Sequence, residues 1–164
     1  AEAVTRYFRR ALSDLQETEK LGLSRDELFE YYYTSRQLER VADHAEKTAR
    51  LVKDPDLELP TVYADEIERF GERARKIVDD AADLILTDGD LRDATAVLAE
   101  RDDFTEEVTD FDRGLYRHDT PEQAYAAGRI LDSLRRTGEY GANVAWIGIQ
   151  QQLRDATASP EAVP

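Results

Sequence analysis

The chain has 164 residues and a formal charge of −14, from 36 Asp and Glu against 22 Lys and Arg. A single domain of this length is large enough to bury a continuous core. The acidity argues against nucleic acid and anionic membrane surfaces as direct partners, because phosphate groups are bound by clustered Lys and Arg and the sequence has no such cluster.

Abundant acids with few lysines are typical of proteins that stay soluble in concentrated salt, where charge repulsion is screened. We therefore interpret the chain as a cytoplasmic protein of a halophile. The lack of cysteine excludes disulfides, thiolate metal sites and a Cys nucleophile. The longest apolar run, Ala142–Ile149, is too short to span a bilayer, so no membrane insertion is expected. Because position 1 is not Met, we expect the chain to begin inside a longer gene product or after processing.

Apolar residues at helical spacing, separated by turn signals, predict five helices. The expected ranges are about 2–20, 25–53, 61–87, 90–117 and 121–153. A capping box of Ser24 and Glu27 precedes the second helix. Gly89 ends the third, and Thr120 with Pro121 begins the fifth. No segment reads as a strand, so the sequence predicts an all-α fold of antiparallel helix bundles.

The second expected helix carries its apolar residues at a seven-residue period, which is typical of helices packed side by side. One row comprises Leu28, Ser35, Ala42 and Ala49, and the other comprises Tyr31, Leu38, Ala45 and Val52. The third helix has the same period, with rows of Ile67, Ala74 and Ala81 and of Phe70, Ile77 and Leu84.

An internal repeat appears when the sequence is shifted by 96 positions. The shift places Leu38 on Leu134, Arg40 on Arg136, Ala42 on Gly138, Asp43 on Glu139, Ala45 on Gly141 and Ala49 on Ala145. The fifth helix is therefore equivalent to the second. We interpret residues 57–154 as a complete three-helix unit, 1–56 as the end of a first unit truncated at its N-terminus, and 155–164 as a flexible tail.

The run LERVADHA, Leu38 to Ala45, resembles the hallmark of the PhoU family of phosphate-uptake regulators. That family carries a Leu-Glu-Arg-hydrophobic-small-Asp-His-Ala motif on the last helix of each of two three-helix repeats. The resemblance implies a cytosolic, non-enzymatic regulator of phosphate transport that links a phosphate ABC transporter and its ATPase to a signalling protein. It also implies negative regulation, a homodimer, and a metal ion on the acidic motif. Some archaeal relatives have a DNA-binding domain ahead of the helical part, which would precede residue 1 here.

Glu39 and Asp43 are the expected metal ligands, because side chains four residues apart lie on one face of a helix. Carboxylate oxygens suit hard divalent ions, or iron where enough of them converge. Glu46, one turn further along, is a further candidate. Two carboxylates do not complete a site, and a facing helix would have to add others, with Asp79, Asp80 and Asp83 as weak candidates.

The second copy of the motif departs from the first. Arg135 stands where the first acid is expected, and Tyr140 replaces the His. Glu139 keeps a carboxylate and is a possible ligand, but this copy is expected to bind metal weakly or not at all.

The alternative to a metal site is that the acids of the first copy form a solvent-exposed edge of the helix and pair with Arg36, Arg40 or Arg50. His44 points about 100° around the helix from Asp43 and is more simply a structural histidine. His118, at a helix C-terminus, fits a capping role.

A row of small residues follows the fifth helix, with Gly138, Gly141 and Gly148 as its glycines. Two interpretations are open: close packing inside the bundle, which is favoured, or a surface where a second subunit approaches. Trp146 lies in the same apolar stretch and is a candidate for partner contact.

Three functions from different classes follow. A regulatory adaptor of phosphate uptake is supported by the motif and the repeat. A carboxylate-bridged metal enzyme would need Glu three residues before a His. Val41 occupies that position before His44, so the sequence does not favour this enzyme. The third is a structural, partner-binding bundle that has lost its metal, as the altered second copy suggests.

Overall fold

The computed structural model describes residues 2–13, 22–54, 59, 61–87, 89–118 and 121–158. These residues form the helices α1 (Glu2–Ser13), α3 (Arg25–Val52), α4 (Thr61–Leu86), α5 (Leu91–His118) and α6 (Pro121–Ala158). Every regular element in these ranges is a helix, which confirms the predicted all-α bundle.

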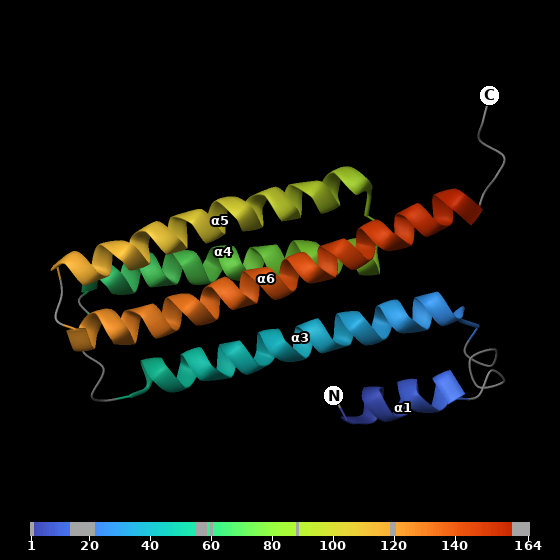
Figure 1. Ribbon diagram of the computed structural model, residues 1–164, viewed down its shortest axis with the longest axis horizontal. Coiled ribbons are helices and arrows are strands. Elements are labelled where there is room, and N and C mark those ends of the chain that lie inside the picture. The colour runs from blue at the N-terminus through green and yellow to red at the C-terminus, as the bar shows by residue number, and fades with distance from the viewer. Residues whose placement is uncertain are drawn as a thin grey trace.

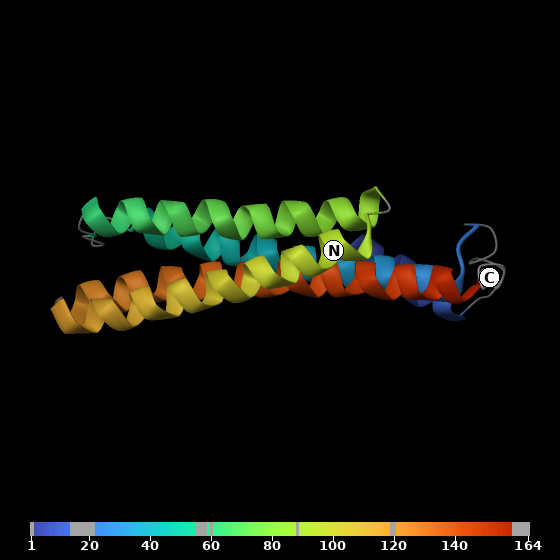
Figure 2. The ribbon, with the colours of Figure 1, turned by 90° about the horizontal axis from the view of Figure 1, so that it is seen from above.

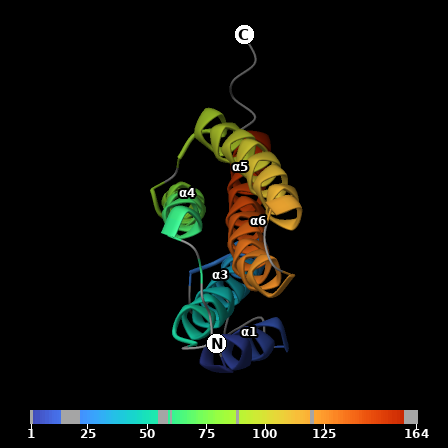
Figure 3. The same cartoon turned by 90° about the vertical axis from the view of Figure 1, so that its left-hand side faces the viewer.

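Helix α6 is the central element of the fold (Figure 1). It packs against α4 and α5 on one side and against α3 on the other, while α1 packs on α3. The end-on view shows α4, α5 and α6 at the corners of a triangle, with α3 and then α1 beneath it (Figure 3). The helices run nearly along one axis, which makes the molecule elongated (Figure 2).

Hydrogen bonds between side chains and backbone N–H groups determine where α3 and α5 begin. The predicted capping box is present: the Glu27 backbone N–H donates to Ser24 Oγ at 3.2 Å, and the Ser24 N–H donates to the Glu27 carboxylate at 2.7 Å. At the start of α5 the Asp93 N–H likewise donates to Asp90 Oδ1 at 2.9 Å. Pro121 is the first residue of α6, as predicted, while the predicted N-cap Thr120 lies outside the described residues.

The main core lies between α4, α5 and α6. The predicted rows of α4 face it, with Phe70 and Ile77 fully buried, and α5 adds the buried Phe104 and Leu115. Phe70 meets Phe104 edge-on, with ring centroids 6.2 Å apart. A smaller cluster joins α1 to α3 through Phe8, Ala11 and Leu28. Phe8 also stacks on Tyr32 at a centroid distance of 3.9 Å.

The heptad rows of α3 differ from those of α4, because most of their residues face solvent. Tyr31, Leu38, Ala42, Ala45, Ala49 and Val52 are all exposed. Helix α3 instead meets α6 through a face about a quarter turn away, which includes Thr34, Gln37, Val41 and His44. The equivalent rows of α6 are covered by α4 and α5, whereas α1 covers only the first turns of α3.

The boundary predicted for the last helix was wrong by several residues. Helix α6 continues through Asp155 to Ala158, a stretch expected to belong to a flexible tail. Nothing in this stretch breaks a helix before Pro160, and the Thr157 hydroxyl donates to the Arg154 carbonyl at 2.7 Å. The remainder of the predicted tail, 159–164, lies outside the described residues.

Replacing Gly141 by Ala is expected to destabilise the fold. The added Cβ would lie 3.0 Å from Ile77 Cγ2 and 3.2 Å from the Val78 Cα, so α4 and α6 would have to separate. Overpacking of this kind costs about 1–3 kcal/mol, against a gain in helix propensity of up to about 1 kcal/mol. Gly114→Ala in α5 is the matched control, since its Cβ would meet no atom within 4 Å. Urea unfolding should rank Gly114→Ala above the wild type and Gly141→Ala below it; the reverse order would contradict the tight contact.

Candidate functional site

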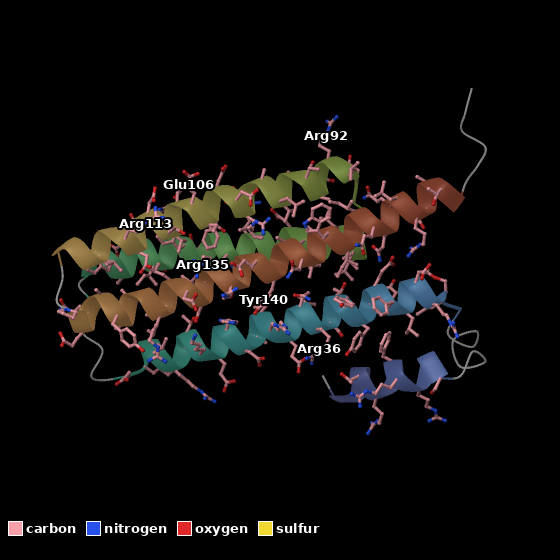
Figure 4. The ribbon with its side chains drawn as sticks, in the orientation of Figure 1. Arg36, Arg92, Glu106, Arg113, Arg135 and Tyr140 are labelled. Atoms are coloured by element: carbon pink, nitrogen blue, oxygen red, sulfur yellow. The ribbon has the colours of Figure 1, made fainter. Side chains whose placement is uncertain are left out.

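The two copies of the repeated motif meet across the contact between α3 and α6. The helices run antiparallel, so His44 faces Tyr140, which occupies the same motif position 96 residues later. Their ring centroids are 5.7 Å apart. The guanidinium carbon of Arg40 lies 5.5 Å from the centroid of the Tyr140 ring, within the range of a cation–π contact. In Figure 4, Tyr140 lies on the side of α6 that faces α3.

Two acids of the first copy, Glu39 and Asp43, line a hollow of about 310 Å³ beside this contact, and Glu46 does not. The hollow is lined by Arg36, Glu39, Arg40, Asp43, His44 and Tyr140. Glu39 forms an ion pair with Arg36, three residues before it, and Glu46 forms one with Arg50. Asp43 is exposed, and no described residue forms an ion pair with it. Arginines therefore already neutralise two of the three candidate ligands.

The second copy is an ion-pair cluster. Glu139 accepts a hydrogen bond from Arg136 at 2.8 Å, and Arg135 donates to Asp132 at 2.8 Å. Asp112 on α5 is close enough for Arg135 to lower its pKa, but burial has the larger effect and raises the pKa of Asp112 above its usual value. Sequence reasoning missed Asp112, although its place next to Phe111 in the apolar stripe of α5 could have marked it as partly buried.

Two of the three carboxylates predicted to complete the metal site form ion pairs elsewhere. Asp79 pairs with Arg75 at 3.0 Å, and Asp80 pairs with Lys76 in the next pair along α4. Asp83 lines a separate hollow between α4 and α5. Over the described part of the chain, no three His, Cys, Asp or Glu side chains converge as a metal site requires. Glu39 and Asp43 therefore need ligands from elsewhere to complete a metal site.

The glycine row of α6 is packed inside the bundle. Gly138, Gly141 and Gly148 are buried against α4 and α5, and a Cβ at Gly138 would lie 3.0 Å from the Phe104 ring. These glycines therefore allow close packing within the chain, which is the favoured of the two interpretations. Trp146 lies on a different face of α6 and is half exposed.

His44 is the titratable group at the centre of the contact. Burial is the main cause that lowers its pKa below the usual histidine value, and the charges of Lys47 and Arg136 lower it further. Asp132 and Asp43 act in the opposite direction. His44 Nδ1 is buried and has no hydrogen-bond partner among the described residues. The side chain of His118 lies outside the described residues.

The fold and this contact define the chain as an all-α helix-bundle protein. No family model, no curated protein and no solved structure matches it. None of the described helices is both long enough and apolar enough to cross a membrane.

The lowered pKa of His44 predicts a loss of stability as the pH falls. Because the folded-state pKa lies below the unfolded value, the unfolded chain takes up the proton first and folding weakens as the pH drops through about 6.5. Proton NMR titration should give His44 a midpoint below 6.5, with the signal assigned by His44→Gln. Lys47→Gln should raise that midpoint, and the exposed Lys53→Gln is the control. A midpoint at or above 6.5 would contradict the burial of the ring.

Proposed function

We propose that the chain is a non-enzymatic, cytoplasmic regulator of phosphate uptake that acts as a helical adaptor on a phosphate ABC transporter ATPase and its signalling partner. The supporting observation is the LERVADHA run together with its position at the contact between α3 and α6. An adaptor requires a recognisable surface held on rigid elements rather than a catalytic pocket. The hollow at Glu39 and Asp43 offers such a surface, with acids and arginines presented side by side.

The exposed face of α3 gives this adaptor a second feature suited to partners. Its apolar residues keep a seven-residue period but face solvent from Leu38 to Val52. Exposed apolar rows of this length are favourable docking places for another helix. A homodimer or a contact with the transporter could cover them.

Metal binding is the second part of the proposal. Glu39 and Asp43 would supply two carboxylates to a divalent or iron-type ion, and a second copy or a partner would have to supply the others. Glu46 and Glu139 are possible contributors, although each is held by an arginine.

The alternative function is a structural, partner-binding bundle without metal. Its support is the neutralisation of Glu39 by Arg36 and of Glu46 by Arg50, which leaves Asp43 as the one acid of the first copy without an ion pair among the described residues. The two readings differ in whether the carboxylates themselves are needed for regulation.

Loss of the gene is expected to leave phosphate uptake high in phosphate-rich medium, because negative regulation of the transporter would be absent. Uptake of radiolabelled phosphate should return to the wild-type level when the intact chain is supplied. Glu39→Ala with Asp43→Ala should fail to restore it if the motif acts in regulation, while Asp79→Ala, on α4, should restore it. Normal repression in the deletion strain would contradict the proposal.

Metal content provides a separate measurement. Protein purified in high salt without a His-tag should carry metal by elemental analysis, and the Glu39→Ala/Asp43→Ala double variant should lose it. If both proteins lack metal after reconstitution, but the double variant still restores regulation, the metal-free alternative is favoured.

A further inference from the structure

A groove between α3 and α6 lies next to the motif hollow but shares no lining residue with it. Its volume is about 500 Å³. Three aromatic residues line it: Phe29 and Tyr33 from α3, and Trp146 from α6. Glu30 and the amide side chains of Gln37 and Asn143 line it as well. The groove therefore combines aromatic faces with oxygen acceptors.

The three rings are only half buried. Phe29 is 49% exposed, Tyr33 46% and Trp146 51%, although each is a large apolar group. The Phe29 and Tyr33 rings are 5.0 Å apart by their centroids. Clustered, exposed aromatic rings on two neighbouring helices are typical of a binding surface rather than of a core.

Glu30 supplies a buried carboxylate, and one of its two oxygens accepts no hydrogen bond from the described residues. The residue is only 9% exposed, and its Oε1 accepts a hydrogen bond from Arg154. Its Oε2 is buried and has no hydrogen-bond partner among the described residues. A buried carboxylate oxygen without a donor costs free energy, which a ligand N–H could recover. Arg154 also pairs with Asp155, so one guanidinium faces two carboxylates and the local charge remains negative.

The other copy of the repeat shows what chemistry fits such a place. The shift of 96 positions carries Phe29 to Tyr125 and Tyr33 to Arg129. There the guanidinium carbon of Arg129 lies 5.8 Å from the centroid of the Tyr125 ring. In the second copy the chain therefore supplies its own guanidinium over the equivalent ring, whereas in the first copy a second ring takes the place of that arginine.

We propose that the groove lined by Phe29, Tyr33, Trp146 and Glu30 binds an arginine side chain from a basic segment of a partner protein. A guanidinium is planar, stacks on aromatic faces and carries five N–H donors that can reach Glu30 and the amides. The Glu30 carboxylate can pair with a guanidinium at short range, where salt screens the interaction less than it screens long-range attraction. The inference stands without the phosphate-regulation proposal, because it uses neither Glu39 nor Asp43.

Trp146 is the only tryptophan of the chain, so its fluorescence reports on this groove directly. Titration with N-acetyl-argininamide at constant ionic strength should give a saturable change, while N-acetyl-glycinamide should give none. Tyr33→Ala should weaken binding by about 5- to 30-fold, as expected for the loss of a cation–π contact. Tyr125→Ala, the equivalent ring of the other copy, is the matched control and should leave binding unchanged.

Two further arms identify the ligand. Tetramethylammonium, which has no N–H donors, should bind several-fold more weakly than N-acetyl-argininamide, and Glu30→Gln should reduce this difference. If circular dichroism shows that Glu30→Gln does not fold, the proposal is tested by comparing the affinities of the wild type for tetramethylammonium and N-acetyl-argininamide. A seven-residue peptide with Arg between two Leu should bind more tightly than N-acetyl-argininamide, because its apolar residues can cover the exposed rings.

Three results would overturn the proposal. A change in fluorescence that rises linearly without saturation would mean non-specific quenching. If Tyr33→Ala and Tyr125→Ala weaken the binding of N-acetyl-argininamide equally, the ligand does not bind in the groove. Equal affinity for the peptide and for N-acetyl-argininamide would assign the groove to a free guanidinium compound instead of a partner segment.

Discussion

The fold depends on α6 being packed on two opposite sides. Gly138, Gly141 and Ala145 on one side let α4 and α5 approach closely, because a larger side chain would meet Phe104 or Ile77. On the other side, Tyr140 meets His44 of α3, and the buried Ile147 lines the groove between α3 and α6. A helix that is apolar on both sides cannot remain at a surface, so α4 and α5 must cover one side while α3 covers the other.

This central position explains why the two copies of the motif meet. Helix α3 runs antiparallel to α6 (Figure 1), and their packing brings the His44 ring against the Tyr140 ring. The acids and arginines that flank these rings then lie along the edge of the contact. Ion pairs such as Arg36–Glu39 and Arg136–Glu139 form within each helix, where partly exposed pairs add little stability. The contact is therefore held mainly by packing, and its charges remain available for recognition.

The first half of the chain offers more uncovered surface than the second. Among the described helices, α6 packs mainly against α3, α4 and α5, whereas α3 packs mainly against α6 and, at its start, against the short α1. The heptad rows of α3 beyond α1 and the aromatic groove beside Trp146 are the two surfaces that result. They lie on different faces of α3, so one chain can present both at once. A helix that covers the heptad rows would leave Phe29 and Tyr33 free.

Sequence alone determined the class of fold and most of the helix limits. Periodic apolar residues, the Ser24–Glu27 capping box and Pro121 are local signals, and each needs only its own neighbours to act. The core rows of α4 followed from the same periodicity. Residues 155–158 have the polar composition of a tail, but no helix breaker occurs there, and α6 extends to Ala158.

Only the tertiary structure decided which apolar face was covered. The heptads of α3 and α6 look alike in sequence, but burial depends on the neighbouring helices, and among the described helices no pair covers α3 as α4 and α5 cover α6. The same limit applies to the site. The spacing of Glu39 and Asp43 placed them on one face, but only the packing of α3 on α6 joined His44 to Tyr140 and Glu30 to Arg154. A contact between residues about a hundred positions apart depends on the register of two helices, which no local pattern contains.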